Sequence, residues 1–365
     1  MKMNKETINC HQFGIIASVL LLTLKFTSLP ALLYECNNVG GVVSISVIVM
    51  INVLFIILLF WLKNKYKNLG IYEILSNGIG TLLTKAIYFI FFVFFIFKLL
   101  SIMSDGYGFI RDVVDEEFTH FNFLICFIPV CCALAFSGLR SIGRTAEFFF
   151  PYVVVGLIVS IMFSFVPVKL WGLGTLAHGT FSGLFRSITE LSFWNGDMLA
   201  MLIFIDKIQV DKRQIKRFIF PYVTISFLLV ITYLVYYSLY QQTSVFHNNL
   251  IYDIVQYAIG TSSGWHMDIF AILIFIICLI IQGGIFIYSA RDCVEKIFNY
   301  NNKTITLISV IMVLIFAEFL FLDDYLEYVV YARMWLSWFG GFVMLIIPAL
   351  FCVLTITRGG KNARH

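Results

Sequence analysis

The chain has 365 residues, of which 60% are apolar and only 13% are charged, whereas about 25% of the residues in an ordinary soluble domain are charged. A water-soluble protein of this length could not bury so much apolar surface in one core. The composition therefore excludes a soluble enzyme, a disordered chain and a secreted disulfide scaffold. The formal net charge of +4 is modest and gives no reason to expect nucleic acid as a partner. We expect an all-α protein whose solvent and partner is the lipid bilayer.

Apolar runs bounded by polar clusters predict ten membrane-spanning helices, because one crossing needs about 20 apolar residues. The third run is expected to continue past the bilayer toward Arg111. The connections are short, so residues 1–365 are predicted to form a single transmembrane domain. In chain order the predicted helices lie at 11–33, 41–62, 81–103, 121–138, 146–167, 184–205, 217–240, 265–290, 304–322 and 332–356.

Charged residues alternate in sign from one connection to the next, which predicts how the chain is oriented in the membrane. Basic residues concentrate in cytoplasmic loops of membrane proteins. If the N-terminus is cytoplasmic, the inside segments hold basic groups such as Lys63 and Lys207, and the outside segments hold acidic groups such as Asp105 and Asp253. An even number of helices then predicts that both termini are cytoplasmic.

Ten helices can form two inverted halves, which here would span approximately residues 9–167 and 184–356. In many secondary transporters built this way, the first helix of each half is broken near the bilayer midplane and its free backbone groups bind the ligand. No internal sequence repeat is visible, so interruptions in predicted helices 1 and 6 are the signal to look for.

The first helix carries such an interruption close to a buried charge. Pro30 removes a backbone donor, and the hydroxyls of Thr23 and Thr27 can satisfy carbonyls that the break leaves free. Lys25 lies near the middle of the apolar run, where a lysine costs at least about 2.5 kcal/mol unless it faces a polar cavity or a partner. Lys25 is therefore a candidate for a ligand or coupling site, and the alternative is a lysine that snorkels or is paired for structural reasons.

The sixth helix contains Asn195-Gly196, a strong helix-breaking pair, followed by Asp197 at membrane depth. An unwound turn here would expose amides, carbonyls and partial charges that suit the carboxylate and ammonium of an amino acid. The alternative is a kink that only assists packing, with Asp197 bonded to a neighbouring hydroxyl. Asp197 could also pair with Lys25.

Other polar groups within the predicted helices give weaker signals. Lys98 and Ser101 in the third helix could line the same cavity, although Lys98 could instead snorkel outward. Arg186 and Glu190 are four residues apart and are expected to form an intrahelical pair. The segment 282–284, Gln-Gly-Gly, is expected to allow close contact between helices.

Motifs of soluble chemistry are missing from the sequence. It contains no Walker loop, no GxGxxG after a strand, no HExxH and no GxSxG, and its six histidines have no metal-ligand spacing. We therefore expect no enzymatic activity, no cofactor and no metal site.

Six short segments, in their order and spacing along the chain, resemble the spore germination permeases, the B subunits of GerA-type germinant receptors. The segments lie at 9–13, 29–30, 40–41, 138–147, 196–197 and 290–292.

The resemblance implies membership of the amino acid–polyamine–organocation superfamily and a LeuT-like fold of two inverted five-helix repeats. It also implies a place in the inner membrane of bacterial spores, partnership with germinant-receptor A and C subunits, and binding of a small nutrient such as an amino acid. By position, the ligand pocket would comprise Thr23, Lys25, Phe26, Thr27, Phe193, Trp194, Asn195, Gly196 and Asp197.

The chain departs from the family pattern at both breaks. The family usually has small residues where this chain has Thr23 and Lys25, and commonly has Glu where this chain has Asp197. A lysine in the pocket could suit an acidic or carboxylate ligand, or it could replace a coupling cation. Two alternatives to the receptor therefore stay open, namely a stand-alone proton- or sodium-coupled amino acid transporter and a purely structural assembly subunit.

Overall fold

The protein is described by a computed structural model that covers residues 7–27, 29–66, 69–164, 179–192, 196–209, 215–247, 249–260, 268–321 and 337–342. Within these ranges the chain is mostly helical, with short 3₁₀ turns labelled η. The elements are β1 (Ile8–Asn9), α1 (Cys10–Leu22), η1 (Thr23–Lys25), α2 (Leu29–Asn37), η2 (Asn38–Gly40), α3 (Gly41–Lys65), α4 (Ile71–Ile79), α5 (Thr81–Val113), α6 (His120–Ser137), α7 (Leu139–Ser164), α8 (Phe181–Glu190), η4 (Gly196–Met198), α10 (Leu199–Ile203), η5 (Ile205–Lys207), β2 (Ile208–Gln209), α11 (Ile215–Tyr240), η7 (Gln241–Phe246), α12 (Leu250–Gly260), α13 (Asp268–Phe298) and α14 (Lys303–Phe321).

Seven of the described helices, α3, α5, α6, α7, α11, α13 and α14, are long and apolar enough to cross a membrane. The chain is therefore an all-α polytopic membrane protein. Predicted helices 1 and 6 are absent from this set because each is interrupted, which leaves pieces shorter than a bilayer crossing. Predicted helix 10 lies mostly outside the described residues, of which 337–342 are helical. The number of ten spans stays a prediction.

Several helix boundaries differ from those predicted. The fifth predicted helix was expected to start at 146, but α7 starts at Leu139, so most of the segment 138–147 is helical. Within this segment, the Glu147 carboxylate accepts a hydrogen bond from the side chain of Gln12 in α1 at 2.9 Å. The expected extension of the third helix is confirmed, because α5 continues to Val113. The short helices α4 and α12 lie in stretches that were predicted to be connections. They were not predicted because neither is long enough to cross a membrane.

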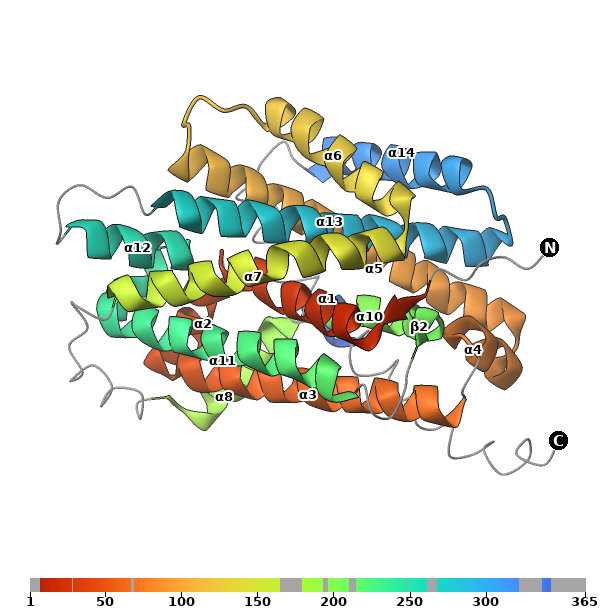
Figure 1. Cartoon of the computed structure of the whole chain (residues 1–365), viewed down its shortest axis with the longest axis horizontal. Helices are drawn as coiled ribbons and strands as arrows, with labels where there is room; N and C mark the ends of the chain where they lie inside the picture. Colours follow the sequence, from red (N-terminus) through yellow and green to blue (C-terminus); the bar gives the residue numbers. More distant parts are fainter. Residues whose placement is uncertain are drawn as a thin grey trace.

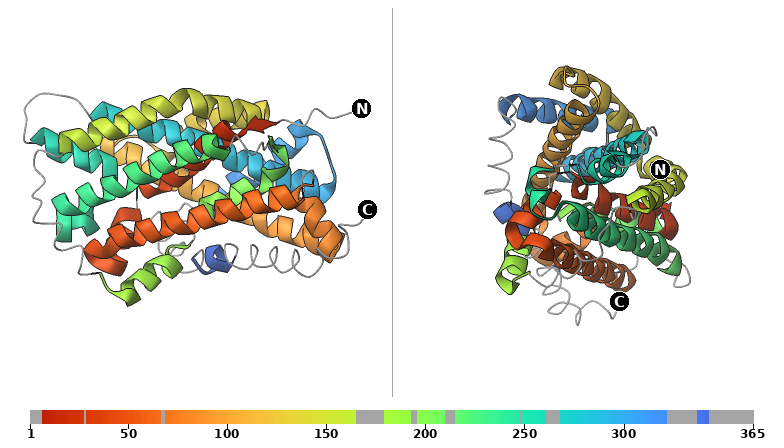
Figure 2. Two further views of the ribbon diagram at one scale, coloured as in Figure 1. Left: turned by 60° about the horizontal axis from the view of Figure 1, so that its bottom comes forward. Right: turned by 90° about the vertical axis from the view of Figure 1, so that its left-hand side faces the viewer.

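The long helices lie roughly along one axis and surround α1, as the end-on view shows (Figure 2). In Figure 1, α1 and α10 lie in the middle of the bundle, with α13 and α7 on one side and α3 and α11 on the other. Every residue of α1 except His11 is buried. A helix that is apolar all round is expected in the interior, so the sequence of α1 accounts for its central position.

Glycines allow the closest helix contacts in the bundle. A side chain at Gly14 of α1 would place its Cβ 2.5 Å from the backbone oxygen of Phe218 in α11. A Cβ at Gly283 of α13 would lie 2.7 Å from the ring of Phe127 and 2.8 Å from the sulfur of Cys131, both in α6. The close helix contact expected at 282–284 is therefore confirmed.

Contacts at the two ends of the bundle agree with the predicted alternation of helix direction. At one end β1 pairs with β2 in parallel, and Lys207 contacts Asp292 at 2.5 Å. At the other end the backbone N–H of Thr180 donates to Asn37 at 3.0 Å. Segments predicted to share a membrane face thus meet at one end of the bundle, although which end faces the cytoplasm stays a prediction.

Replacement of Gly14 by alanine tests the central position of α1. The new methyl group would clash with backbone that cannot rotate away, so we expect Gly14→Ala to lower the free energy of unfolding by about 1–3 kcal/mol. Thermal unfolding of the detergent-solubilised protein measures the change. The matched control is Ser18→Ala one turn later, which removes only a bond from Ser18 to the Gly14 carbonyl of the same helix. Equal melting temperatures for Gly14→Ala and wild type would contradict the close α1–α11 contact.

Candidate functional site

The first helix of the chain is interrupted where Pro30 and the threonines predicted it. Regular α1 ends at Leu22, a single 3₁₀ turn follows at Thr23–Lys25, and α2 begins at Leu29. Pro30 is the second residue of α2, a position where its missing N–H costs nothing. The hydroxyl of Thr23 donates a hydrogen bond to the carbonyl of Val19, one turn earlier in α1, at 3.3 Å. The break therefore lies between Lys25 and Leu29.

Other helices donate hydrogen bonds to backbone carbonyls on both sides of the break. Tyr233 and Tyr237 of α11 donate their hydroxyls to the carbonyls of Lys25 and Pro30, each at 2.7 Å. The backbone N–H of Leu250 in α12 donates to the carbonyl of Phe26 at 2.8 Å. The carbonyls of Lys25 and Phe26 at the break thus bond to the bundle itself.

The donor tyrosines were missed in the sequence, although a signal exists. Tyr233, Tyr236, Tyr237 and Tyr240 follow the spacing i, i+3, i+4, i+7, which places all four on one face of a helix. Several phenolic hydroxyls on one buried helix face need hydrogen-bond acceptors, and an interrupted helix supplies free carbonyls.

The second break is also present. Helix α8 ends at Glu190, and the chain re-enters the described region at Gly196, where the 3₁₀ turn η4 leads into α10. Phe193, Trp194 and Asn195, which were predicted to line the site, lie outside the described residues. A Cβ at Gly196 would come within 2.6 Å of the Phe94 ring, so glycine is what allows η4 to lie against α5.

Asp197 is bound by two lysines at the point where the two breaks meet. Its Oδ2 accepts a hydrogen bond from Lys25 Nζ at 2.5 Å, and its Oδ1 lies 2.7 Å from Lys98 Nζ. The Lys25 contact has hydrogen-bond geometry, whereas the Lys98 contact is a close ion pair without that alignment. All three side chains are 1% exposed or less. We call Lys25, Lys98 and Asp197 the charge triad.

The charge triad resolves two alternatives that the sequence left open. Lys25 and Asp197 do pair with each other. Lys98 does not snorkel outward, because its side chain is fully buried and turned toward Asp197. Three elements that are distant in the sequence, η1, α5 and η4, supply one member each.

A second carboxylate lies beside the helix 1 break. Thr27 donates its hydroxyl to Asp105 Oδ2 at 3.0 Å, and both side chains are buried. Asp105 lies in the part of α5 that was predicted to extend toward Arg111, seven residues after Lys98 and therefore on the same helix face. Ser101, between them, donates to the carbonyl of Phe97 in its own helix at 3.1 Å.

The formal charges of this region follow directly from its members. The charge triad alone sums to +1, and Asp105 brings the region to zero. Uncompensated charge in a membrane interior is costly, so the cationic triad requires a nearby anion. Asp105 meets this requirement, and the two ammonium groups of the triad are the charges to which a carboxylate could bind. Within the described residues no group of three or more His, Cys, Asp or Glu side chains could hold a metal ion.

Arg186 and Glu190 are joined as the sequence predicted. They form an exposed i, i+4 pair at 2.6 Å within α8 and lie apart from the charge triad.

A cluster of polar groups from the end of α11, η7 and α12 is connected by hydrogen bonds to the helix 1 break. Tyr240 donates to the carbonyl of Asp253 at 2.7 Å, and Tyr236 donates to the carbonyl of His247 at 2.9 Å. The Asp253 carboxylate accepts the backbone N–H of Asn249 at 3.0 Å, and Leu250, the next residue, bonds to Phe26 in the break. Burial raises the pKa of Asp253 to about 7.

Comparison with known proteins identifies one family. A family model described as spore germination protein matches residues 7–324, which include every member of the charge triad and both breaks. No curated protein matches the chain.

The raised pKa of Asp253 predicts how stability depends on pH. Its carboxyl titrates near pH 7 in the folded chain and near pH 4 when unfolded, so burial disfavours the charged form. The free energy of unfolding should therefore fall as the pH rises from about 4 to about 7, and the penalty is complete above that range. Asp253→Asn should remove the penalty, a few kcal/mol at pH 8.

Melting temperatures of the wild type and of Asp253→Asn, measured from pH 4 to 8, test this expectation. The variant should be more stable at pH 8 and similar to wild type at pH 4. The exposed control Glu116→Gln should follow the wild type throughout. A constant difference between Asp253→Asn and wild type across the range would contradict the titration of Asp253.

Proposed function

Because the chain belongs to the spore germination protein family and has several membrane-spanning helices, we propose that it is the membrane subunit of a spore germinant receptor. In this proposal it binds a small nutrient, an amino acid in the simplest case, near the bilayer midplane and thereby triggers germination. The family is not one of enzymes. The observation that carries the proposal is the charge triad between two interrupted helices.

The chemistry of the charge triad suits a ligand that carries a carboxylate. Asp197 is shared by the ammonium groups of Lys25 and Lys98, and Asp105 is close enough to attract Lys98. A ligand carboxylate would bind one of the two ammonium groups, and charge-assisted hydrogen bonds of this kind are about twice as strong as neutral ones. The ammonium of an amino acid would then have Asp197 or Asp105 within the same region.

The burial of the triad supports a signalling role. Lys25, Lys98 and Asp197 are closed to solvent, so a ligand can reach them only when the two breaks separate. A ligand that binds the separated arrangement more tightly shifts the equilibrium toward it. Tyr233 and Leu250 tie the helix 1 break to α11 and α12, so the shift would reach the end of the bundle.

The remaining parts of the proposal rest on the family and on the two breaks. They are a LeuT-like arrangement of two five-helix halves, with the breaks in the first helix of each half. They also include cytoplasmic termini, the spore inner membrane as the location, and the A and C subunits of the receptor as the partners that respond to the shift.

Lys98→Met is the substitution that tests the site most cleanly. Lys25→Ala leaves Lys98 as the sole cation on Asp197, and Asp197→Ala removes the carboxylate that two buried lysines share. Lys98→Met leaves the neutral Lys25–Asp197 pair in place, so we expect a moderate loss of stability and a protein that still accumulates. We expect it to lose at least tenfold in affinity for carboxylate ligands and to abolish the germination response, because one of the two cations that could bind the carboxylate is gone.

The measurement is equilibrium binding of the twenty labelled amino acids to purified protein, together with germination of spores that carry each variant. Lys98→Arg should retain part of the response, and Lys216→Met, an exposed lysine at the start of α11, should retain all of it. Normal binding and response from Lys98→Met would sink the assignment. Loss of the protein itself would point to a structural role. Concentrative uptake by the isolated chain in liposomes would favour a transporter.

A further inference from the structure

Gln282 lies in the middle of α13 with a side chain that has no evident partner. It is fully buried, and neither the nitrogen nor the oxygen of its amide has a hydrogen-bond partner within the described part of the chain. The glycines that follow it in the sequence account for the close contact of α13 with α6. They do not account for a glutamine at this position.

A buried amide without partners is unusual in a protein interior. The large majority of buried side-chain polar atoms are hydrogen-bonded, because burial removes the bonds that water would make. Within a membrane no water is available to compensate, and polar side chains there commonly mark pathways and binding sites for ligands. No group among the described residues meets this need of the Gln282 amide, and a bound ligand could meet it.

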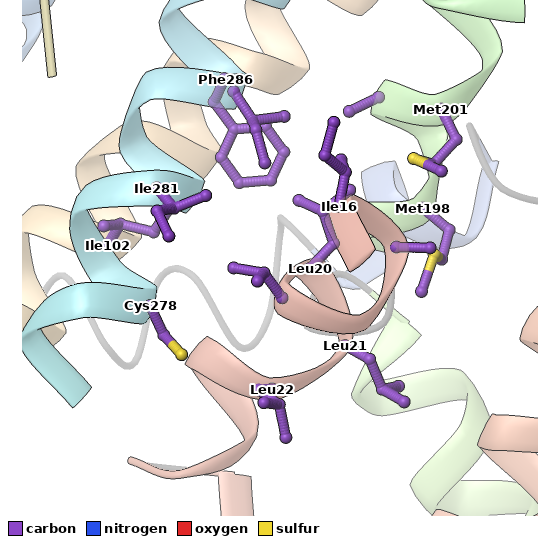
Figure 3. Packing of buried hydrophobic residues seen from close by; sticks show 14 of the residues in the cluster. Ile16, Leu20, Leu21, Leu22, Ile102, Met198, Met201, Cys278, Ile281 and Phe286 are labelled. Carbon is purple, nitrogen blue, oxygen red and sulfur yellow. The ribbon is translucent and has the colours of Figure 1, made fainter. Parts of the chain in front are cut away.

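The face of α13 that carries Gln282 is turned toward α1. Cys278 and Phe286 lie one turn before and one turn after Gln282, on the same helix face. Figure 3 shows both side chains directed toward the space around Leu20 of α1, together with Ile281. The 3₁₀ turn η1, which carries Lys25, also packs against α13. Gln282 thus belongs to the wall of α13 that meets the helix 1 break.

Contacts between α5 and α13 place Gln282 at the level of Lys98. The rings of Phe95 and Phe286 lie 5.9 Å apart, and a Cβ at Gly106 would lie 2.7 Å from Leu279. The two helices therefore run antiparallel, and these two contacts bracket Lys98 on α5 and Gln282 on α13. The amide of Gln282 and the ammonium group of Lys98 occupy the same short stretch of this interface.

We infer that Gln282 determines ligand specificity at the proposed nutrient site, and that the ligand carries a group that both donates and accepts hydrogen bonds, such as a carboxamide or a hydroxyl. The inference rests on the proposed function. A primary amide offers two donor hydrogens and an acceptor oxygen, so a carboxamide or hydroxyl can satisfy both of its ends. The carboxylate of the same ligand would bind Lys98. A site built this way rejects an apolar ligand of equal size, because that ligand leaves the amide unpaired.

Paired ligands of equal size test the inference. Glutamine against methionine isolates the carboxamide, and threonine against valine isolates the hydroxyl. Equilibrium binding of the four labelled amino acids to purified protein should show at least a tenfold preference of the wild type for the polar member of one pair. Gln282→Met should reduce that preference at least tenfold, mainly through weaker binding of the polar ligand.

Ser289→Ala is the matched control on the same helix. Ser289 is fully buried but already donates to the carbonyl of Ile285 at 2.8 Å, so its removal should leave the preference unchanged. A preference that survives in Gln282→Met, with binding intact, would overturn the inference and leave the proposed function standing. A wild type that binds none of the twenty amino acids would overturn both.

Thermal unfolding supplies a readout that needs no ligand. If the amide of Gln282 is unpaired, Gln282→Met removes only a buried polar group, and its melting temperature should equal or exceed that of the wild type. A marked fall would show that the amide serves the packing of the bundle, and this result would contradict the inference.

Discussion

A single carboxylate shared by two ammonium groups is the interaction on which the centre of this protein depends. Asp197 joins Lys25 and Lys98 where almost no solvent reaches them. None of the three could remain charged there alone, because an isolated ion in a membrane interior is costly. The sharing therefore requires η1, α5 and η4 to meet, and the interruption of two helices is what allows them to do so.

The surrounding structure compensates for the breaks in the backbone. Tyr233 and Leu250 donate to the carbonyls of Lys25 and Phe26, which an unbroken helix would have satisfied itself, and Tyr237 donates to the carbonyl of Pro30 in α2. Gly196 lets η4 lie against Phe94, and Gly14 lets α1 lie against α11. These contacts hold a closed arrangement in which two ammonium groups share the carboxylate of Asp197. In the proposed function a ligand carboxylate would bind one of these ammonium groups, which would link the local geometry to the sensing of a nutrient.

The two breaks could be predicted because their signals are local. Pro30 and the pair Asn195-Gly196 disfavour helix through their own chemistry, and Lys25 and Asp197 stand out as charges within apolar runs. The partnership of Lys98 could not be predicted, because it depends on how α5 is rotated against η4. The contact of Asp105 with Thr27 could not be predicted for a related reason, since it depends on how α5 packs against the helix 1 break. Helices α4 and α12 are too short for a span criterion to find.

The most direct test of the account is a double-mutant cycle on the charge triad, read as the free energy of unfolding in detergent. Asp197→Asn should cost about 3–5 kcal/mol, because it removes the carboxylate that two buried lysines share. Lys98→Met should destabilise the wild type but stabilise the Asp197→Asn protein, where it removes one of two like charges. A coupling energy of about 1 kcal/mol or more with this reversal of sign is the predicted result. Effects of the two substitutions that simply add would contradict the shared carboxylate.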